Sequence, residues 1–224
     1  MTFSIAARSP ESGMFGVAVC SSSPAVTARC AHTRTGVGAA TSQNVTDPAL
    51  GPAILDLMAD GLDARKAVAE VARGTQWREY RQLTAVDHRG GSFVYTGSGA
   101  LGVSSGCAAE DVACAGNLLA DKDIPEIMVQ AFQLSEGHLA DRIIETMKAA
   151  LRAGGEEGPV HSAGLKIVHE VSWPIVDLRV DWTGECPIEQ LAKLWSIYAP
   201  QVDDYVTRAL DPGAAPSYGV PGDH

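Results

Sequence analysis

The chain has 224 residues, of which 46% are apolar and 20% are charged, and its formal net charge at pH 7 is −10. This length and apolar content are ample for the core of one globular domain. The acidic balance argues against nucleic acid and anionic membrane surfaces as partners. No apolar run is long enough to span a membrane and no signal segment opens the sequence. We therefore expect a cytoplasmic protein.

Motifs for metals and cofactors are absent from the sequence. The five cysteines are scattered, and none forms a Cys-x-x-Cys pair. Acidic pairs occur without histidines at metal-ligand spacing, and there is no phosphate loop or dinucleotide fingerprint. We predict no metal, no cofactor and no disulfide framework, with the cysteines and the four tryptophans buried in the core.

Largely unbroken apolar runs joined by turn residues predict hairpins, and helical periodicity predicts pairs of helices between them. Gly16 lies within a predicted strand, which indicates close approach of another element. Residues 21–35 are polar and irregular, and residues 97–110 are small and glycine-rich. In chain order, the predicted elements are strands at 2–8, 14–20 and 36–43, helices at 50–60 and 63–73, strands at 82–87, 92–96 and 111–116, helices from 118 and at 138–153, strands at 164–169 and 175–182, and a long helix at 188–210.

The grouping of these elements predicts the fold class. Strands come in hairpin groups with helix pairs between them, which argues against a doubly wound parallel sheet. It favours an α+β fold, a four-layer αββα sandwich of two antiparallel sheets flanked by helices. We expect one domain at residues 1–211 and a flexible tail at 212–224, which is rich in Pro, Gly, Ala and Ser.

Thr2 follows the initiator methionine and opens the first strand. Its side chain is small enough for methionine aminopeptidase to remove Met1. A free N-terminal threonine carries a nucleophilic hydroxyl and an α-amine that acts as its base, so no separate Ser-His pair is needed. This chemistry fails if Met1 is retained.

Five stretches resemble one family. They are residues 2–5 with 16–19, 36–39 with 41–43, 80–82 with 86–87, 115–118, and 154–156 with 162–163. In this order they resemble the domain-of-unknown-function 1028 (DUF1028) family, whose members look like N-terminal-nucleophile (Ntn) hydrolases. The opening hairpin resembles that of proteasome-type subunits. The resemblance implies an αββα fold with Thr2 as nucleophile.

The chain departs from the proteasome pattern in one respect. None of its five lysines follows the second strand, and Arg29, His32 and Arg34 occupy that region instead. The site therefore has to rely on the α-amine of Thr2, as in the amidase and acylase branches of the fold.

Polar residues at predicted strand ends are candidates for the site. Ser21, Ser22 and Ser23 end the second strand, where a hydroxyl can orient the Thr2 amine or relay its proton, or simply form a turn. Gln43 and Asn44 end the third strand, where an amide can stabilise an oxyanion, hold a substrate carbonyl, or cap the next helix.

Gly116 and Asn117 sit at a predicted switch from strand to helix. Main-chain amides at the start of a helix favour an anion or oxyanion. We predict that Asn117 is functional and that Gly116 belongs to the same binding region.

Substrate contacts are expected from later segments. His161 and Ser162 follow a glycine-rich loop, Glu156 is placed to bind a substrate amine, and Arg81 can clamp a carboxylate. Ordinary surface roles remain open for each: a solvated loop carboxylate, a surface histidine, or a salt bridge.

These observations predict an Ntn amidohydrolase that cleaves a small-molecule amide-type C–N bond through Thr2, with Asn117, Gln43 and Ser22 in catalytic roles. The alternative is an Ntn-like scaffold that binds a small metabolite without catalysis. A third reading takes Ser22 or Cys20 as nucleophile with His32 nearby, although no nucleophile-elbow motif surrounds them. We expect a homodimer with a small-molecule substrate.

Overall fold

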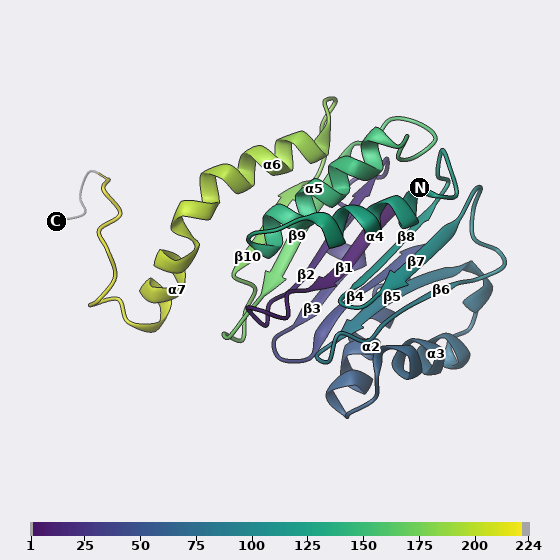
Figure 1. Ribbon diagram of the computed structural model, residues 1–224, viewed down its shortest axis with the longest axis horizontal. Coiled ribbons are helices and arrows are strands. Elements are labelled where there is room, and N and C mark those ends of the chain that lie inside the picture. The colour runs from purple at the N-terminus through teal and green to yellow at the C-terminus, as the bar shows by residue number, and fades with distance from the viewer. Residues whose placement is uncertain (1, 221–224) are drawn as a thin grey trace.

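The computed structural model describes residues 2–220 and contains two antiparallel sheets packed face to face, with helices on both outer faces (Figure 1). The six-stranded sheet has the order β10-β9-β2-β1-β8-β7, and the four-stranded sheet has the order β3-β4-β5-β6. This is the αββα sandwich expected from the grouping of strands. The strands are β1 (Thr2–Arg8), β2 (Phe15–Ser21), β3 (Ala31–Arg34), β4 (Gly38–Asn44), β5 (Arg81–Asp87), β6 (Ser92–Thr96), β7 (Ser105–Ala109), β8 (Val112–Asn117), β9 (Ser162–Val168) and β10 (Val176–Val180).

Helices form the two outer layers. Two of them cover the four-stranded sheet, and three lie on the six-stranded sheet. Over the four-stranded sheet these are α2 (Leu50–Ala59) and α3 (Ala64–Gly74), and over the six-stranded sheet they are α4 (Ile124–Leu134), α5 (Leu139–Arg152) and α6 (Pro187–Tyr198). Gly16 permits the contact of α5 with β2, because a Cβ there would lie 2.6 Å from Cδ1 of Ile143.

Strand alternation divides the apolar residues among three cores. One side of β1 and β2 packs under α4 and α5, through residues such as Phe3 and Cys20. The other side packs against the four-stranded sheet, through small residues such as Ala6 and Ala39. These small side chains let the two sheets approach closely. The face of β1 that carries Ala6 is therefore the face between the two sheets. The third core lies between the four-stranded sheet and the helices α2 and α3, and contains Leu83.

The irregular stretches contain two edge strands that the sequence pattern does not predict. A short helix, α1 (Thr27–Cys30), and β3 lie within residues 21–35, and β7 lies within residues 97–110. Edge strands pair on one side only, so they need less apolar alternation than the central strands. Their hydrophobic signal in the sequence is correspondingly weak.

Two helix predictions are corrected. The helix expected directly after Asn117 begins at Ile124, because the main-chain amides of Leu118 and Leu119 donate to the carbonyls of Leu101 and Val103. The long C-terminal helix is broken into α6, a 3-10 turn (Ala199–Gln201) and α7 (Val202–Leu210). Pro200 lies in this turn and cannot donate the helical hydrogen bond.

The tryptophans also differ from expectation. Only Trp195 is buried, at 6% exposure, whereas Trp77, Trp173 and Trp182 are exposed at 58%, 39% and 60%. In the described part of the chain, no helix combines the length and apolar character that a membrane crossing needs. Residues 212–220 form neither helix nor strand, and the end of the predicted tail, 221–224, lies outside the described residues.

Candidate functional site

A row of polar residues crosses the six-stranded sheet at the end where β1 begins. Thr2 of β1 pairs with Asn117 of β8, and Ser21 of β2 pairs with Ser162 of β9. Phe3 pairs with Cys20, so Ser21 lies beside Thr2 on its other flank. All four polar side chains are buried, with Thr2 the most exposed at 5%. Four neighbouring strands thus place four polar groups in a line.

The row faces the space between the sheets. Thr2 and Ala6 share a face of β1, because side chains alternate along a strand, and Ala6 belongs to the core between the sheets. Phe3 and Cys20 point the opposite way, toward the helices. The sandwich interior at this end is therefore polar, whereas further along the strands it is apolar.

Hydroxyl groups connect Thr2 to a cation. The Thr2 hydroxyl donates to Oγ of Ser21 over a long 3.4 Å, and Oγ of Ser21 lies 2.8 Å from Oγ of Ser23. The guanidinium of Arg29 donates to Oγ of Ser23 at 2.9 Å. Ser22 instead contributes its main-chain N–H to Glu156. The sequence had indicated the serine run as a whole, and the fold places Ser21 and Ser23 in the chain from Thr2.

Three amide side chains link the two sheets beside this row. Oε1 of Gln82 accepts from Nε2 of Gln43 at 2.8 Å and from Nδ2 of Asn117 at 3.2 Å. Nε2 of Gln82 donates to the carbonyls of Gly116 and Ser105. A carbonyl oxygen can only accept a hydrogen bond, so the Gln82 nitrogen must face these two carbonyls. The Gln82 oxygen then faces Gln43 and Asn117. Gln43 and Asn117 must then both present their NH₂ groups to it.

This orientation leaves two buried acceptors unused. Oε1 of Gln43 and Oδ1 of Asn117 have no hydrogen-bond partner among the described residues, and both side chains are fully buried. Buried polar atoms without partners are uncommon and costly in folded proteins. Each NH₂ group also retains a second hydrogen beyond the one given to Gln82. The amide cluster can therefore both donate to and accept from a ligand.

Glu156 is a buried carboxylate at the edge of the row. It is 4% exposed, and both of its oxygens accept from the N–H of Ser22 at 3.2 Å. Burial raises the pKa of Glu156 above its ordinary value, while the charge of the amino terminus, the Ser22 hydrogen bond and the nearby His161 oppose the rise. A carboxylate in this setting favours a cationic neighbour.

His161 and Ser162 fix the segment that borders Ser21. The main-chain N–H of His161 donates to the Ser21 carbonyl, and its Nδ1 lies 2.8 Å from the Thr183 carbonyl. The His161 ring stacks on exposed Trp182, with centroids 4.4 Å apart. Oγ of Ser162 donates to the carbonyl of Ser23 at 2.6 Å, so it holds the serine loop in place.

Other predicted site residues lie on different faces. Asn44 and Arg81 pair across β4 and β5 on the helix side of the four-stranded sheet, so they do not share the space between the sheets with Thr2. Asn44 bridges two loops instead, through the Tyr80 carbonyl and the Leu101 N–H. Gly116 pairs with Phe3, and a Cβ there would meet Leu119. Gly116 does not lie at the start of a helix, contrary to the prediction from the sequence. Its main-chain carbonyl accepts a hydrogen bond from Gln82 of the amide cluster.

The arrangement of Cys20 and His32 does not support the third reading. Cys20 lies in the core under the helices of the six-stranded sheet, and burial raises the pKa of its thiol well above the ordinary value. His32 pairs with Ala40 and its ring lies against Gly51 of α2, on the far side of the other sheet. Two sheets therefore separate these two side chains.

Several residues of this region were not singled out from the sequence as site residues. Gln82 had a signal, because it begins a strand in which Gln82 and Thr84 share one face, an unusual polar run for a buried strand. Trp182 had none, since its exposure depends on tertiary contacts. No cluster of three His, Cys, Asp or Glu residues able to hold a metal occurs within residues 2–220.

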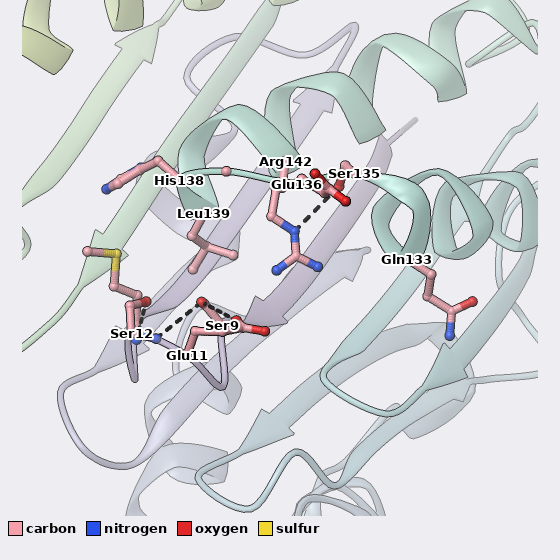
Figure 2. Close-up of a pocket in the computed structure, with 11 residues that line it drawn as sticks. Ser9, Glu11, Ser12, Gln133, Ser135, Glu136, His138, Leu139 and Arg142 are labelled. Atoms are coloured by element: carbon pink, nitrogen blue, oxygen red, sulfur yellow. Dashed lines mark hydrogen bonds between the residues drawn. The ribbon is translucent and has the colours of Figure 1, made fainter.

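A cavity of about 480 Å³ lies at the other end of β1, between the β1–β2 turn and the start of α5 (Figure 2). It is lined by polar residues such as Glu11, His138 and Arg142. The Arg142 guanidinium already donates to Ser135 and to the carbonyl of Phe132. At about 3.4 Å per residue, the length of β1 separates this cavity from Thr2 by roughly 20 Å.

Residues 2–191 match the DUF1028 family, described as a family of unknown function. The chain belongs to this family. A crystal structure of a DUF1028 family protein from Silicibacter pomeroyi is 29% identical and superposes with a TM-score of 0.82, covering 88% of this chain and 89% of that one. The αββα fold and the Thr2 end of the sandwich lie within the matched residues.

More remote structures resemble this DUF1028 protein weakly. Anbu (ancestral beta-subunit) from Yersinia bercovieri is 13% identical, with a TM-score of 0.38 over 90% of this chain and 96% of that chain. An Anbu mutant from Hyphomicrobium sp. strain MC1 is 13% identical, with a TM-score of 0.41 over 91% and 97%. No curated protein matches the sequence.

Proposed function

We propose that this DUF1028 protein is an Ntn amidohydrolase that cleaves an amide-type C–N bond of a small molecule through Thr2. The observation that carries the proposal is the setting of Thr2. It begins a central strand, faces a polar space between two sheets, and lies between Ser21 and Asn117. A hydroxyl nucleophile flanked by a second hydroxyl and a primary amide has the parts that acyl transfer needs.

The proposed reaction begins after Met1 is removed. Oγ1 of Thr2 attacks the substrate carbonyl carbon while the α-amine of Thr2 takes the hydroxyl proton. The tetrahedral intermediate collapses, the C–N bond breaks, and the leaving nitrogen receives that proton. Water, activated by the same amine, then hydrolyses the acyl ester and restores the hydroxyl.

Asn117 is the proposed oxyanion donor. One hydrogen of its Nδ2 goes to Gln82, and the second is available to a substrate oxygen. Gln43 is held in the same way and is the proposed second donor. One well-placed donor contributes about 3 kcal/mol to transition-state stabilisation in other hydrolases. Ser21, Ser23 and Arg29 are proposed to hold the Thr2 hydroxyl in place.

The decisive experiment is an intact-mass measurement on protein made without a tag, followed by a screen of small amides, lactams and ureido compounds. We expect a mass without Met1 and hydrolysis of at least one class. Thr2→Ala should abolish turnover, and Thr2→Ser should retain part of it because it keeps the hydroxyl and the amine. Retention of Met1, or full activity of Thr2→Ala, would contradict the proposal.

The two unused acceptors support a second candidate, a protein that binds a small metabolite without catalysis. Oε1 of Gln43 and Oδ1 of Asn117 favour a ligand with N–H donors. This candidate predicts that a ligand found by thermal-shift screening stabilises the Thr2→Ala variant as strongly as the wild type, and that no product forms. Loss of stabilisation in that variant would argue against it.

A homodimer in the cytoplasm is a further part of the proposal. Exposed apolar side chains on α6 and α7, including Ile197 at 58% and Leu210 at 64%, support a contact between two copies. Light scattering coupled to size-exclusion chromatography tests this. A monomer mass at micromolar concentration would contradict it.

A further inference from the structure

Glu156 is anchored from two sides at the start of β1. Its carboxylate accepts from the N–H of Ser22 with both oxygens, and its main chain pairs with Leu119 in an isolated antiparallel bridge. The Leu118 carbonyl accepts the N–H of Glu157, which continues this attachment. The carboxylate is therefore held by the ends of β2 and β8.

These anchor points surround the first residue of β1. Ser22 follows Ser21, which receives the Thr2 hydroxyl, and Leu119 lies two residues beyond Asn117, the strand partner of Thr2. Gly155, next to Glu156, lies against the ring of Phe3, which is 3.5 Å from the position of a Cβ on that glycine. The segment that contains Glu156 therefore contacts the ends of β2 and β8, the two strands beside Thr2. It also contacts Phe3, the residue that follows Thr2.

The charge of Glu156 is unpaired among the described residues. No lysine, arginine or histidine within residues 2–220 forms an ion pair with it. The charge of the chain's amino terminus and, more weakly, that of His161 lower the pKa of Glu156, and the charge of Glu156 in turn raises the pKa of Cys20. A buried carboxylate with one main-chain donor is costly, and a cation beside it removes much of that cost.

We propose that Glu156 is the partner of the α-ammonium group of Thr2 after Met1 is removed, and so a positioning residue for the catalytic base. The inference rests on the proposed function, because it assigns a role at the same site. Removal of Met1 creates a cation at the start of β1, where the fold holds a buried carboxylate. The ion pair fixes the direction of the amine relative to the Thr2 hydroxyl.

The pair also sets the proton affinity of the amine. Burial alone lowers the pKa of an α-amine from its ordinary value of about 8. A carboxylate within about 4–6 Å raises the pKa by about one to three units. The two effects oppose each other, and a general base works best when its pKa lies near the operating pH.

The test measures the pKa of the α-amine directly. The chain beginning at Thr2 is labelled with [¹⁵N]threonine, and the α-amine nitrogen is titrated by NMR in wild type, Glu156→Gln and Glu157→Gln. Glu157 is the matched control, because it is the adjacent carboxylate and is exposed. We expect Glu156→Gln to lower the α-amine pKa by about one to three units and Glu157→Gln to change it little.

Equal shifts in the two variants, or no shift in Glu156→Gln, would overturn the inference. If Glu156→Gln does not fold, Glu156→Asp takes its place, because withdrawing the carboxylate by one methylene should also lower the α-amine pKa. An unchanged pKa in Glu156→Asp would then overturn it.

The outcome is separable from that of the proposed function. A protease site engineered before Thr2 frees the amine even where the host retains Met1, and the titration needs no substrate. Absence of hydrolysis therefore counts against the proposed function alone, and an unshifted pKa counts against the role of Glu156 alone.

Discussion

Nε2 of Gln82 donates to the main-chain carbonyl of Gly116 at 2.9 Å, and this bond ties the four-stranded sheet to the six-stranded one. The same amide accepts from Gln43 and Asn117 at its other end. A single side chain therefore orients the two amides that flank the Thr2 end of the sandwich.

Replacing Gln82 should cost stability and disorder the site together. Gln82→Leu keeps the size but leaves the NH₂ groups of Gln43 and Asn117 without an acceptor, at about 1–3 kcal/mol for each buried group left unpaired. Urea unfolding measures the loss. The double variant Gln43→Leu/Gln82→Leu should lose less than the sum of the single variants, because one unpaired group is removed. Additive losses would show that the amides do not act as a unit.

The hydroxyl chain makes a prediction about Ser23. Ser23→Ala removes the link between Ser21 and Arg29, so we expect kcat/KM to fall by up to about 100-fold through misplacement of the Thr2 hydroxyl. Ser22→Ala keeps the main-chain donor to Glu156 and should lose less. Rates on a substrate from the amide screen give the comparison. A larger loss in Ser22→Ala would show that Ser22 rather than Ser23 positions the Thr2 hydroxyl.

Acid should lower the free energy of unfolding of the protein, because it protonates His138. Nδ1 of His138 accepts from the N–H of Ala140 and caps α5, and Figure 2 shows the side chain at the start of that helix. Burial, aided by His169, lowers the pKa of His138 below its ordinary value, although Asp141 and Asp203 oppose this. The unfolded chain then binds the proton more readily than the folded one. The cap's contribution is present above about pH 6.5 and is lost as the pH falls through the lower folded pKa.

His138→Asn tests this prediction, because asparagine is a good cap that does not titrate. The stability of the wild type relative to the variant should fall by about 1 kcal/mol between pH 7.5 and pH 5, as measured by chemical unfolding at each pH. A difference that stays constant with pH would exclude His138 as the titrating cap.

Two glycines should respond differently to alanine. A Cβ at Gly164 would lie 2.1 Å from Oγ1 of Thr27, a stiff β-branched side chain in α1, whereas at Gly16 it would meet the flexible end of Ile143 at 2.6 Å. We expect Gly164→Ala to cost about 1–3 kcal/mol, with a smaller loss in Gly16→Ala. Thermal unfolding of the two variants compares them. A larger loss of stability in Gly16→Ala than in Gly164→Ala would show that the packing of β2 against α5 is tighter than that of β9 against α1.

The central strands and the helix pairs could be predicted from the sequence, because strands buried on both faces are largely continuous apolar runs and helices with one buried face follow a 3.6-residue pattern. Thr2 as the candidate nucleophile followed from its position behind Met1 and from its chemistry. The edge strands β3 and β7 could not be predicted, since each is held by one partner strand and carries little apolar signal. The break at Pro200 had a local signal that the surrounding helical periodicity outweighed.

By itself, the sequence determined the central strands, the helix pairs, the sandwich class and the polar character of several strand ends, because these depend on local pattern. Only the tertiary structure decided which polar ends meet. Register places Asn117, Thr2, Ser21 and Ser162 in one row, and it turns Asn44 and Arg81 to the opposite face of their sheet. A change of register by one residue turns every side chain of a strand to the opposite face. Contacts between segments that are distant in the sequence fix the register.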